Sequence, residues 1–168
     1  VWLDPVLAQK EVTAIRDALI KKYPEKKAVF EKNTAAYLEK LTALDKEYQA
    51  AFAGAKNRTF VTQHAAFGYL AKQYGLTQEP IAGISPDQEP SPSRLAELKK
   101  YIKTNNVSVI YFEASASTKV AKTLADETGV ELAVLNPLES LTQKEQEAGE
   151  NYVSVMKENL AALQKSIH

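Results

Sequence analysis

The residues best suited to chemistry in this sequence follow short apolar runs of the kind that form strands. His64 follows the first run, Asp87 and Glu89 the second, Glu113 the third and Glu139 the fourth. The carboxyl ends of parallel strands share one edge of the sheet, and ligands bind there. Imidazole and carboxylate groups are ligands for zinc, manganese or iron. The pattern predicts one imidazole and several carboxylates along a single edge.

Each of these residues also has an ordinary structural interpretation. His64 fits the start of a helix, where it would hydrogen-bond a neighbour, because no H-x-x-E-H or H-E-x-x-H pairing accompanies it. Glu113 either caps the helix that follows or orients His64 as a hydrogen-bond partner. Asp87, Glu89 and Glu139 also fit solvated loop acids. The spacing alone leaves these alternatives open.

Several other chemistries find no support. The absence of cysteine excludes disulfides, thiolate catalysis and cysteine-bound metal centres. Ser115 and Ser117 follow a strand-like run, but no G-x-S-x-G motif surrounds them. Gly83 stands alone, without a glycine-rich phosphate loop. His168, at the end of the sequence, is interpreted as solvated or as the remnant of a purification tag. A nucleophilic or nucleotide-dependent enzyme is therefore disfavoured.

From residue 57 onward, strand-like runs alternate with helical patterns, which is typical of β-α units on a parallel sheet. The runs predict four strands, at 59–61, 80–84, 107–112 and 132–135. Helices are predicted at 65–74, 93–105 and 118–128. A last helix is predicted to open with a capping box at Thr142 and Glu145 and to continue through Leu163. The prediction is an α/β fold whose four-stranded parallel sheet is flanked by helices.

The first third of the sequence is predicted to be helical. An apolar stripe at Ala8, Val12, Ile15 and Leu19 follows the Asp4-Pro5 helix start. After a break at residues 23–24, a second helix is predicted over about 26–53, which is roughly 40 Å at 1.5 Å per residue. A helix longer than a small domain is typical of a connection between two bodies.

Length and net charge further limit the classes of protein that this sequence fits. The chain has 168 residues, and its 21 Lys and Arg balance 21 Asp and Glu. One ordinary core suits this length, and zero net charge argues against nucleic acid or an anionic membrane as partner. No apolar run reaches the roughly 20 residues of a membrane helix. Because the chain starts at Val1 and not at Met, a processed or trimmed product is expected.

Four segments together resemble a known family. They are residues 1–5 (VWLDP), 62–71 (TQHAAFGYLA), 83–91 (GISPDQEPS) and 135–139 (LNPLE). In order and separation they are similar to the zinc- and manganese-binding solute-binding lipoproteins of bacterial ABC metal importers, and most to the zinc branch. The resemblance covers essentially the whole chain.

The resemblance implies two α/β lobes joined by a long helix, with the metal between the lobes. Residues 1–54 would hold the last helix of the N-terminal lobe and the long connecting helix. Residues 55–168 would form the C-terminal metal-binding lobe. The remainder of the N-terminal lobe is expected to be missing from this chain.

The resemblance also implies the metal ligands. His64 matches the histidine of the C-terminal lobe, which favours zinc over manganese, and Glu139 matches its acidic ligand. Glu113 and Asp87 are expected to support these ligands rather than to bind metal. A further ligand histidine is expected just before Val1 and another in the early N-terminal lobe. With two of four ligands present, the chain alone should bind zinc weakly, and uncovered apolar surface should favour self-association.

The function that this resemblance implies is extracellular, high-affinity zinc capture and delivery to an ABC permease, without catalysis. The protein would be a cell-surface or periplasmic lipoprotein whose lipid anchor lies outside this chain. Two other functions fit the same residues. One is a zinc hydrolase in which metal-bound water attacks the substrate. The other is a metal-free interaction module of flavodoxin-like architecture.

Overall fold

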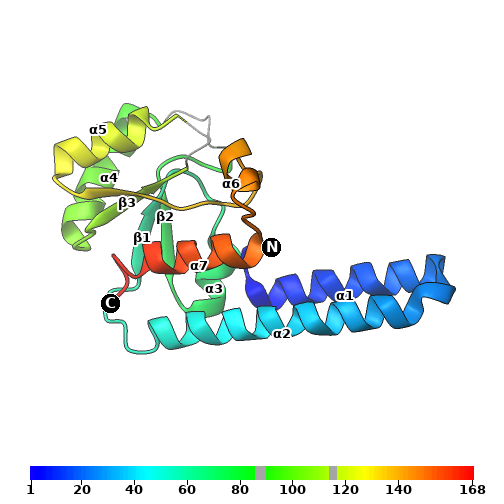
Figure 1. Cartoon of the computed structure of the whole chain (residues 1–168). Helices are drawn as coiled ribbons and strands as arrows, with labels where there is room; N and C mark the ends of the chain where they lie inside the picture. Colours follow the sequence, from blue (N-terminus) through cyan, green and yellow to red (C-terminus); the bar gives the residue numbers. More distant parts are fainter. Residues whose placement is uncertain (86–89, 114–116) are drawn as a thin grey trace.

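The protein, described by a computed structural model at residues 1–85, 90–113 and 117–168, is built around one parallel sheet (Figure 1). The sheet has four strands in the order β2-β1-β3-β4. The strands are β1 (Thr59–Thr62), β2 (Thr77–Pro80), β3 (Val109–Phe112) and β4 (Glu131–Val134). The predicted α/β fold with a four-stranded parallel sheet is confirmed.

Helices cover both faces of the sheet because its two central strands, β1 and β3, are buried on both sides. Helices α4 (Pro92–Thr104) and α5 (Lys119–Thr128) pack on one face, and α2 (Lys27–Phe52), α3 (Gly68–Tyr74) and α7 (Tyr152–Leu163) on the other. Along β1, Phe60 belongs to the core with α2 and Val61 to the core with α4. Successive strand residues point to opposite faces, so both cores need apolar residues.

The strand expected at 80–84 lies earlier in the chain than predicted. Gly75 ends α3 in a left-handed conformation (φ 64°), and Thr77 already pairs with Thr59. The edge strand β2 carries the sequence TQEP, which is only partly buried, so no apolar run marks it. The apolar residues Ile81 and Ala82 come after the strand. Their backbone N–H groups still donate to the carbonyls of Thr62 and Gln63, at 2.8 and 2.9 Å.

The last helical stretch is two helices, so the prediction of one is wrong. Helix α6 spans Gln143–Glu147, and α7 begins at Tyr152. Gly149 between them has a φ of 77°, which interrupts a helix. The predicted capping box is confirmed: Thr142 and Glu145 bond reciprocally. Hydrogen bonds from the Thr142 side chain and backbone hold the pKa of the Glu145 carboxyl below its usual range.

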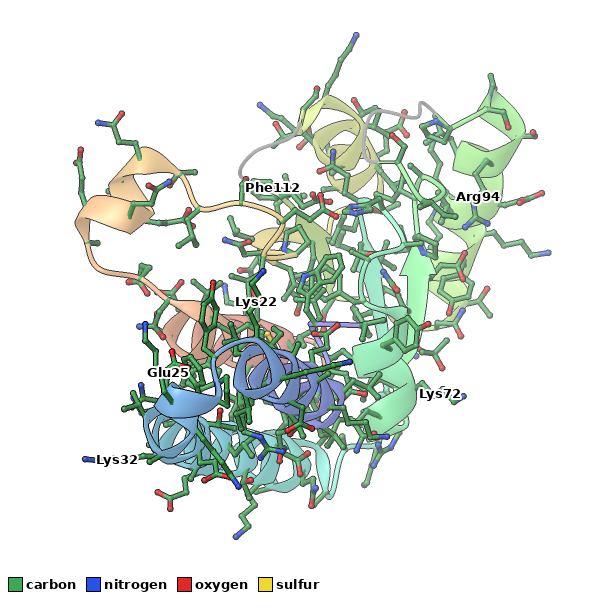
Figure 2. The ribbon with its side chains drawn as sticks, turned by 90° about the vertical axis from the view of Figure 1, so that its right-hand side faces the viewer. Lys22, Glu25, Lys32, Lys72, Arg94 and Phe112 are labelled. Atoms are coloured by element: carbon green, nitrogen blue, oxygen red, sulfur yellow. The ribbon has the colours of Figure 1, made fainter. Side chains whose placement is uncertain are left out.

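The two N-terminal helices form an antiparallel hairpin that extends beyond the sheet (Figure 1). Helix α1 spans Pro5–Lys22, the short 3-10 helix η1 spans Pro24–Lys26, and α2 has 26 residues, about 39 Å at 1.5 Å per residue. Figure 2 looks onto the end of this hairpin and labels Lys22, Glu25 and Lys32 around it.

The projecting half of the hairpin leaves apolar side chains uncovered. Residues of α2 near the sheet, from Leu41 to Phe52, include its most deeply buried side chains, whereas Ile15 in α1 is 60% exposed and Val29 57% exposed. Of the apolar stripe predicted for α1, only the first residue, Ala8, is buried. Within the described part of the chain, no helix has both the length and the apolar character that crossing a bilayer requires.

Tyr48 links the long helix to α7 and provides a test of this packing. Its ring is fully buried against Phe52 and Tyr74, burial raises its pKa, and its hydroxyl donates to the Met156 carbonyl at 2.7 Å. We expect Tyr48→Phe to lower the free energy of unfolding by about 1 kcal/mol, because one buried hydrogen bond is lost and the ring remains. Urea denaturation measures this. Tyr69→Phe, at a half-exposed ring, is the control and should change little.

Candidate metal centre

His64 lies in the connection between β1 and α3, with its backbone fixed on both sides. Its carbonyl accepts hydrogen bonds from the Thr62 hydroxyl at 2.8 Å and from the Gln78 amide at 2.9 Å. The next residue, Ala65, donates its N–H to the Gly83 carbonyl at 2.9 Å. Because α3 begins only at Gly68, the interpretation of His64 as a helix-start residue is wrong.

Glu113 meets the His64 ring because of the sheet register. Thr62 of β1 pairs with Tyr111 of β3, and His64 and Glu113 each lie two residues beyond this pair. Glu113 Oε1 contacts His64 Nδ1, and the two residues are only 4% and 2% exposed. A carboxylate on Nδ1 favours the tautomer with the proton on Nδ1, which leaves the Nε2 lone pair available for a metal.

Glu139 approaches the other ring nitrogen from the loop after β4. Its Oε1 lies 3.5 Å from His64 Nε2, and its side chain is 49% exposed. This distance is long for a hydrogen bond. Two ligands bound to one tetrahedral zinc at about 2.1 Å would lie about 3.4 Å apart. The separation of Nε2 and Oε1 therefore matches the distance between two ligand atoms bound to the same tetrahedral zinc ion.

Three side chains of metal-ligand type thus converge from three different strand ends. Ligand atoms of His64, Glu113 and Glu139 all lie within 4.8 Å of one another. His64 and Glu139 also line a surface hollow of about 360 Å³, together with Trp2, Tyr69 and Lys72. Figure 2 labels Lys72 on α3. The buried imidazole can therefore be reached by an ion from solvent, on the side where Glu139 lies.

The other residues considered from the sequence do not add to this group within the part of the chain that the structure describes. Asp87 and Glu89, like Ser115, lie outside the described residues. His168 is exposed, and its backbone carbonyl accepts hydrogen bonds from the N–H groups of Lys56 and Asn57. Sequence reasoning also missed Gln63, a buried residue that is 7% exposed. Its side chain donates to the Ser117 carbonyl and accepts from the Glu113 N–H.

A parallel α/β sheet that brings a histidine and two carboxylates together at its strand ends is an arrangement that can hold a metal ion. Comparison with known proteins identifies the family. The family described as "Zinc-uptake complex component A periplasmic" matches residues 1–166, and the chain belongs to this family. The resemblance to zinc-binding solute-binding proteins of metal importers is therefore confirmed.

Named relatives support the same assignment. The zinc-binding lipoprotein AdcA of Streptococcus pneumoniae is 58% identical over 166 residues, which cover 99% of this chain and 33% of AdcA. The high-affinity zinc uptake system protein ZnuA of Bacillus subtilis is 55% identical over 99% of this chain and 52% of its own length. The crystal structure of the Zn(II)-bound ZnuA-like domain of S. pneumoniae AdcA superimposes with a TM-score of 0.86.

That superposition covers 99% of this chain and 62% of the other chain, at 58% identity. The chain thus spans about a third of AdcA, about half of ZnuA and under two thirds of the solved domain. The relatives' names describe zinc binding and uptake, and they give no support to the hydrolase or to the metal-free module.

Proposed function

We propose that this chain is part of a protein that captures zinc outside the cell and passes it to an ABC permease. The observation that carries the proposal is the 3.5 Å separation of His64 Nε2 and Glu139 Oε1, which fits a shared zinc ion. The names of the relatives support zinc as the ion and a lipoprotein as the setting. We place the protein at the cell surface for the same reason.

The proposed chemistry is binding and release. Neutral His64 and ionised Glu139 bind the ion, and Glu113 orients the imidazole through Nδ1. Residues 55–168 form the metal-binding lobe in this proposal, and residues 1–54 supply the connecting helices. An imidazole nitrogen suits zinc better than manganese, which prefers oxygen ligands.

Zinc titration of the chain tests this function. Two direct ligands leave two positions of a tetrahedral zinc to water or to groups outside the described residues. We therefore expect a dissociation constant that is roughly micromolar and not nanomolar, and weaker binding of manganese. Competition with a chromophoric chelator gives the affinity, and size-exclusion chromatography gives the oligomeric state, since the exposed side chains of the hairpin favour self-association.

Each outcome of this titration tests a different claim: the function, the number of ligands or the identity of the ion. A chain that binds no zinc contradicts the proposed function. Nanomolar affinity in a demonstrated monomer contradicts the ligand count, because it requires further ligands within this chain. Stronger binding of manganese than of zinc contradicts the assignment of the ion.

Glu113→Gln tests how the buried carboxylate acts. The amide keeps the shape of Glu113 and still offers an oxygen to His64 Nδ1, but it lacks the negative charge that makes the imidazole a stronger ligand. We expect zinc affinity to fall about 10- to 100-fold while the protein stays folded. The same chelator competition measures this, with circular dichroism for folding. An unchanged affinity would show that the charge of Glu113 plays no part.

A further inference from the structure

The loop between β4 and Glu139 has a backbone shape that its own sequence does not favour. Leu135, the residue after β4, still bonds to the sheet, through its N–H to the Phe112 carbonyl at 3.0 Å. Three residues later, Leu138 has a φ of 54°, in the left-handed region that side-chain-bearing residues avoid. Contacts with the rest of the molecule must hold this conformation, and Glu139 is the next residue.

Asn159 of α7 holds the start of this loop. Its side chain is almost fully buried (2% exposed), and its Oδ1 accepts from the Asn136 N–H at 2.8 Å. Its Nδ2 donates to the Asn136 carbonyl at 2.7 Å. One amide side chain therefore satisfies both main-chain groups of a residue 23 positions earlier. No other amino acid of this size offers a donor and an acceptor in this arrangement.

Asn136, once held, fixes the residues that follow it. Its Oδ1 accepts from the Leu138 N–H at 2.8 Å, which closes a tight turn around the left-handed residue. Its Nδ2 donates to Glu145 Oε1 at 3.1 Å. Pro137 lies between Asn136 and Leu138, and its carbonyl accepts a hydrogen bond from the Trp2 indole N–H at 2.9 Å. The backbone of each of the three residues before Glu139 is thus held by a side chain.

We propose that Asn159 is a positioning residue for zinc capture: by holding Asn136 it sets the turn at Leu138 and aims the Glu139 carboxylate at His64 Nε2. The proposal rests on the proposed function. The Glu139 side chain is half exposed, so packing does not fix it, and its direction depends on the backbone that carries it. A ligand that is already oriented loses less conformational freedom on binding zinc than a free one.

Asn159→Leu tests the proposal, because leucine has a similar size but can neither donate nor accept. We expect zinc affinity of the 168-residue chain to fall about 10- to 100-fold. Tyr48→Phe is the matched control: it also removes a buried hydrogen bond to α7, but that bond is made to the Met156 carbonyl and not to the loop before Glu139. It should lower the melting temperature and leave zinc affinity unchanged.

A double-mutant cycle with Glu139→Gln distinguishes positioning from general destabilisation. If Asn159 acts through Glu139, then adding Asn159→Leu to Glu139→Gln should weaken zinc binding by less than about twofold further. Titration followed by NMR keeps weak binding measurable. An equal loss in both backgrounds would overturn the proposal, as would wild-type affinity in Asn159→Leu. If the unmutated chain binds no zinc, the proposed function itself fails.

A second variant covers the case in which Asn159→Leu does not fold. Asn136→Ala removes the acceptor for the Leu138 N–H from a partly buried side chain, and it leaves the main-chain bonds to Asn159 in place. It should give the same loss of zinc affinity and the same lack of additivity with Glu139→Gln. Additive losses in this cycle would overturn the proposal.

Discussion

His64→Asn is expected to remove zinc binding while leaving the chain folded. The Asn side-chain amide can take the place of Nδ1 and donate to the Glu113 carboxylate, so that the buried partner stays paired. It has no atom at the position of Nε2, which is the proposed zinc ligand. Losing the hydrogen-bond partner of a metal ligand typically weakens binding by about 10- to 100-fold. Losing the ligand itself should cost more, so we expect the zinc affinity to fall by more than about 100-fold. Chelator competition measures the loss, and circular dichroism confirms the fold.

The second histidine provides the control for this variant. His168 is exposed at the end of the chain, and its backbone carbonyl accepts hydrogen bonds from the N–H groups of Lys56 and Asn57. His168→Asn should bind zinc as the unmutated chain does. A His64→Asn protein that keeps its zinc affinity, or a His168→Asn protein that loses it, would show that the imidazole of His64 is not the ligand.

Glu139→Gln is expected to produce the next largest loss of zinc affinity. The neutral amide oxygen is a poorer zinc ligand than a carboxylate, and the favourable charge next to the ion is lost. We expect a loss of at least about 10- to 100-fold. The free energy of unfolding should change by less than about 0.5 kcal/mol, because the side chain is 49% exposed.

An exposed acid away from the site is the matched control for Glu139→Gln. Glu158 lies on α7 with an exposed side chain. Glu158→Gln removes the same charge and should leave zinc affinity unchanged. Equal losses in the two variants would mean that general electrostatic attraction, and not coordination by Glu139, explains the effect.

The sequence predicted the sheet and the site for one physical reason. Apolar runs mark strands that are buried on both faces, and polar residues directly after them must lie at the same edge. This reasoning predicts His64, Glu113 and Glu139 at one edge of the sheet, where the structure has them. It failed at β2, because an edge strand with the sequence TQEP carries no apolar signal and the apolar residues follow the strand.

The support around the site could not be predicted in the same way. Asn136 before a proline fits any turn, and Asn159 lies in an ordinary helical pattern. Their contact joins positions 23 residues apart and exists only because α7 packs beside the end of β4. Likewise, periodicity in α1 predicted an apolar stripe but could not show that Ile15 would remain exposed. Local patterns indicate which face is apolar, and tertiary packing decides what covers it.

The most direct test is a crystal structure of this chain with zinc, with the ion located by anomalous diffraction at the zinc absorption edge. The proposal predicts one zinc ion about 2.0–2.1 Å from His64 Nε2 and about 2.0–2.2 Å from a Glu139 oxygen, with Glu113 still on Nδ1. Zinc bound through other side chains, or through His64 Nδ1 with Glu113 displaced, would contradict it.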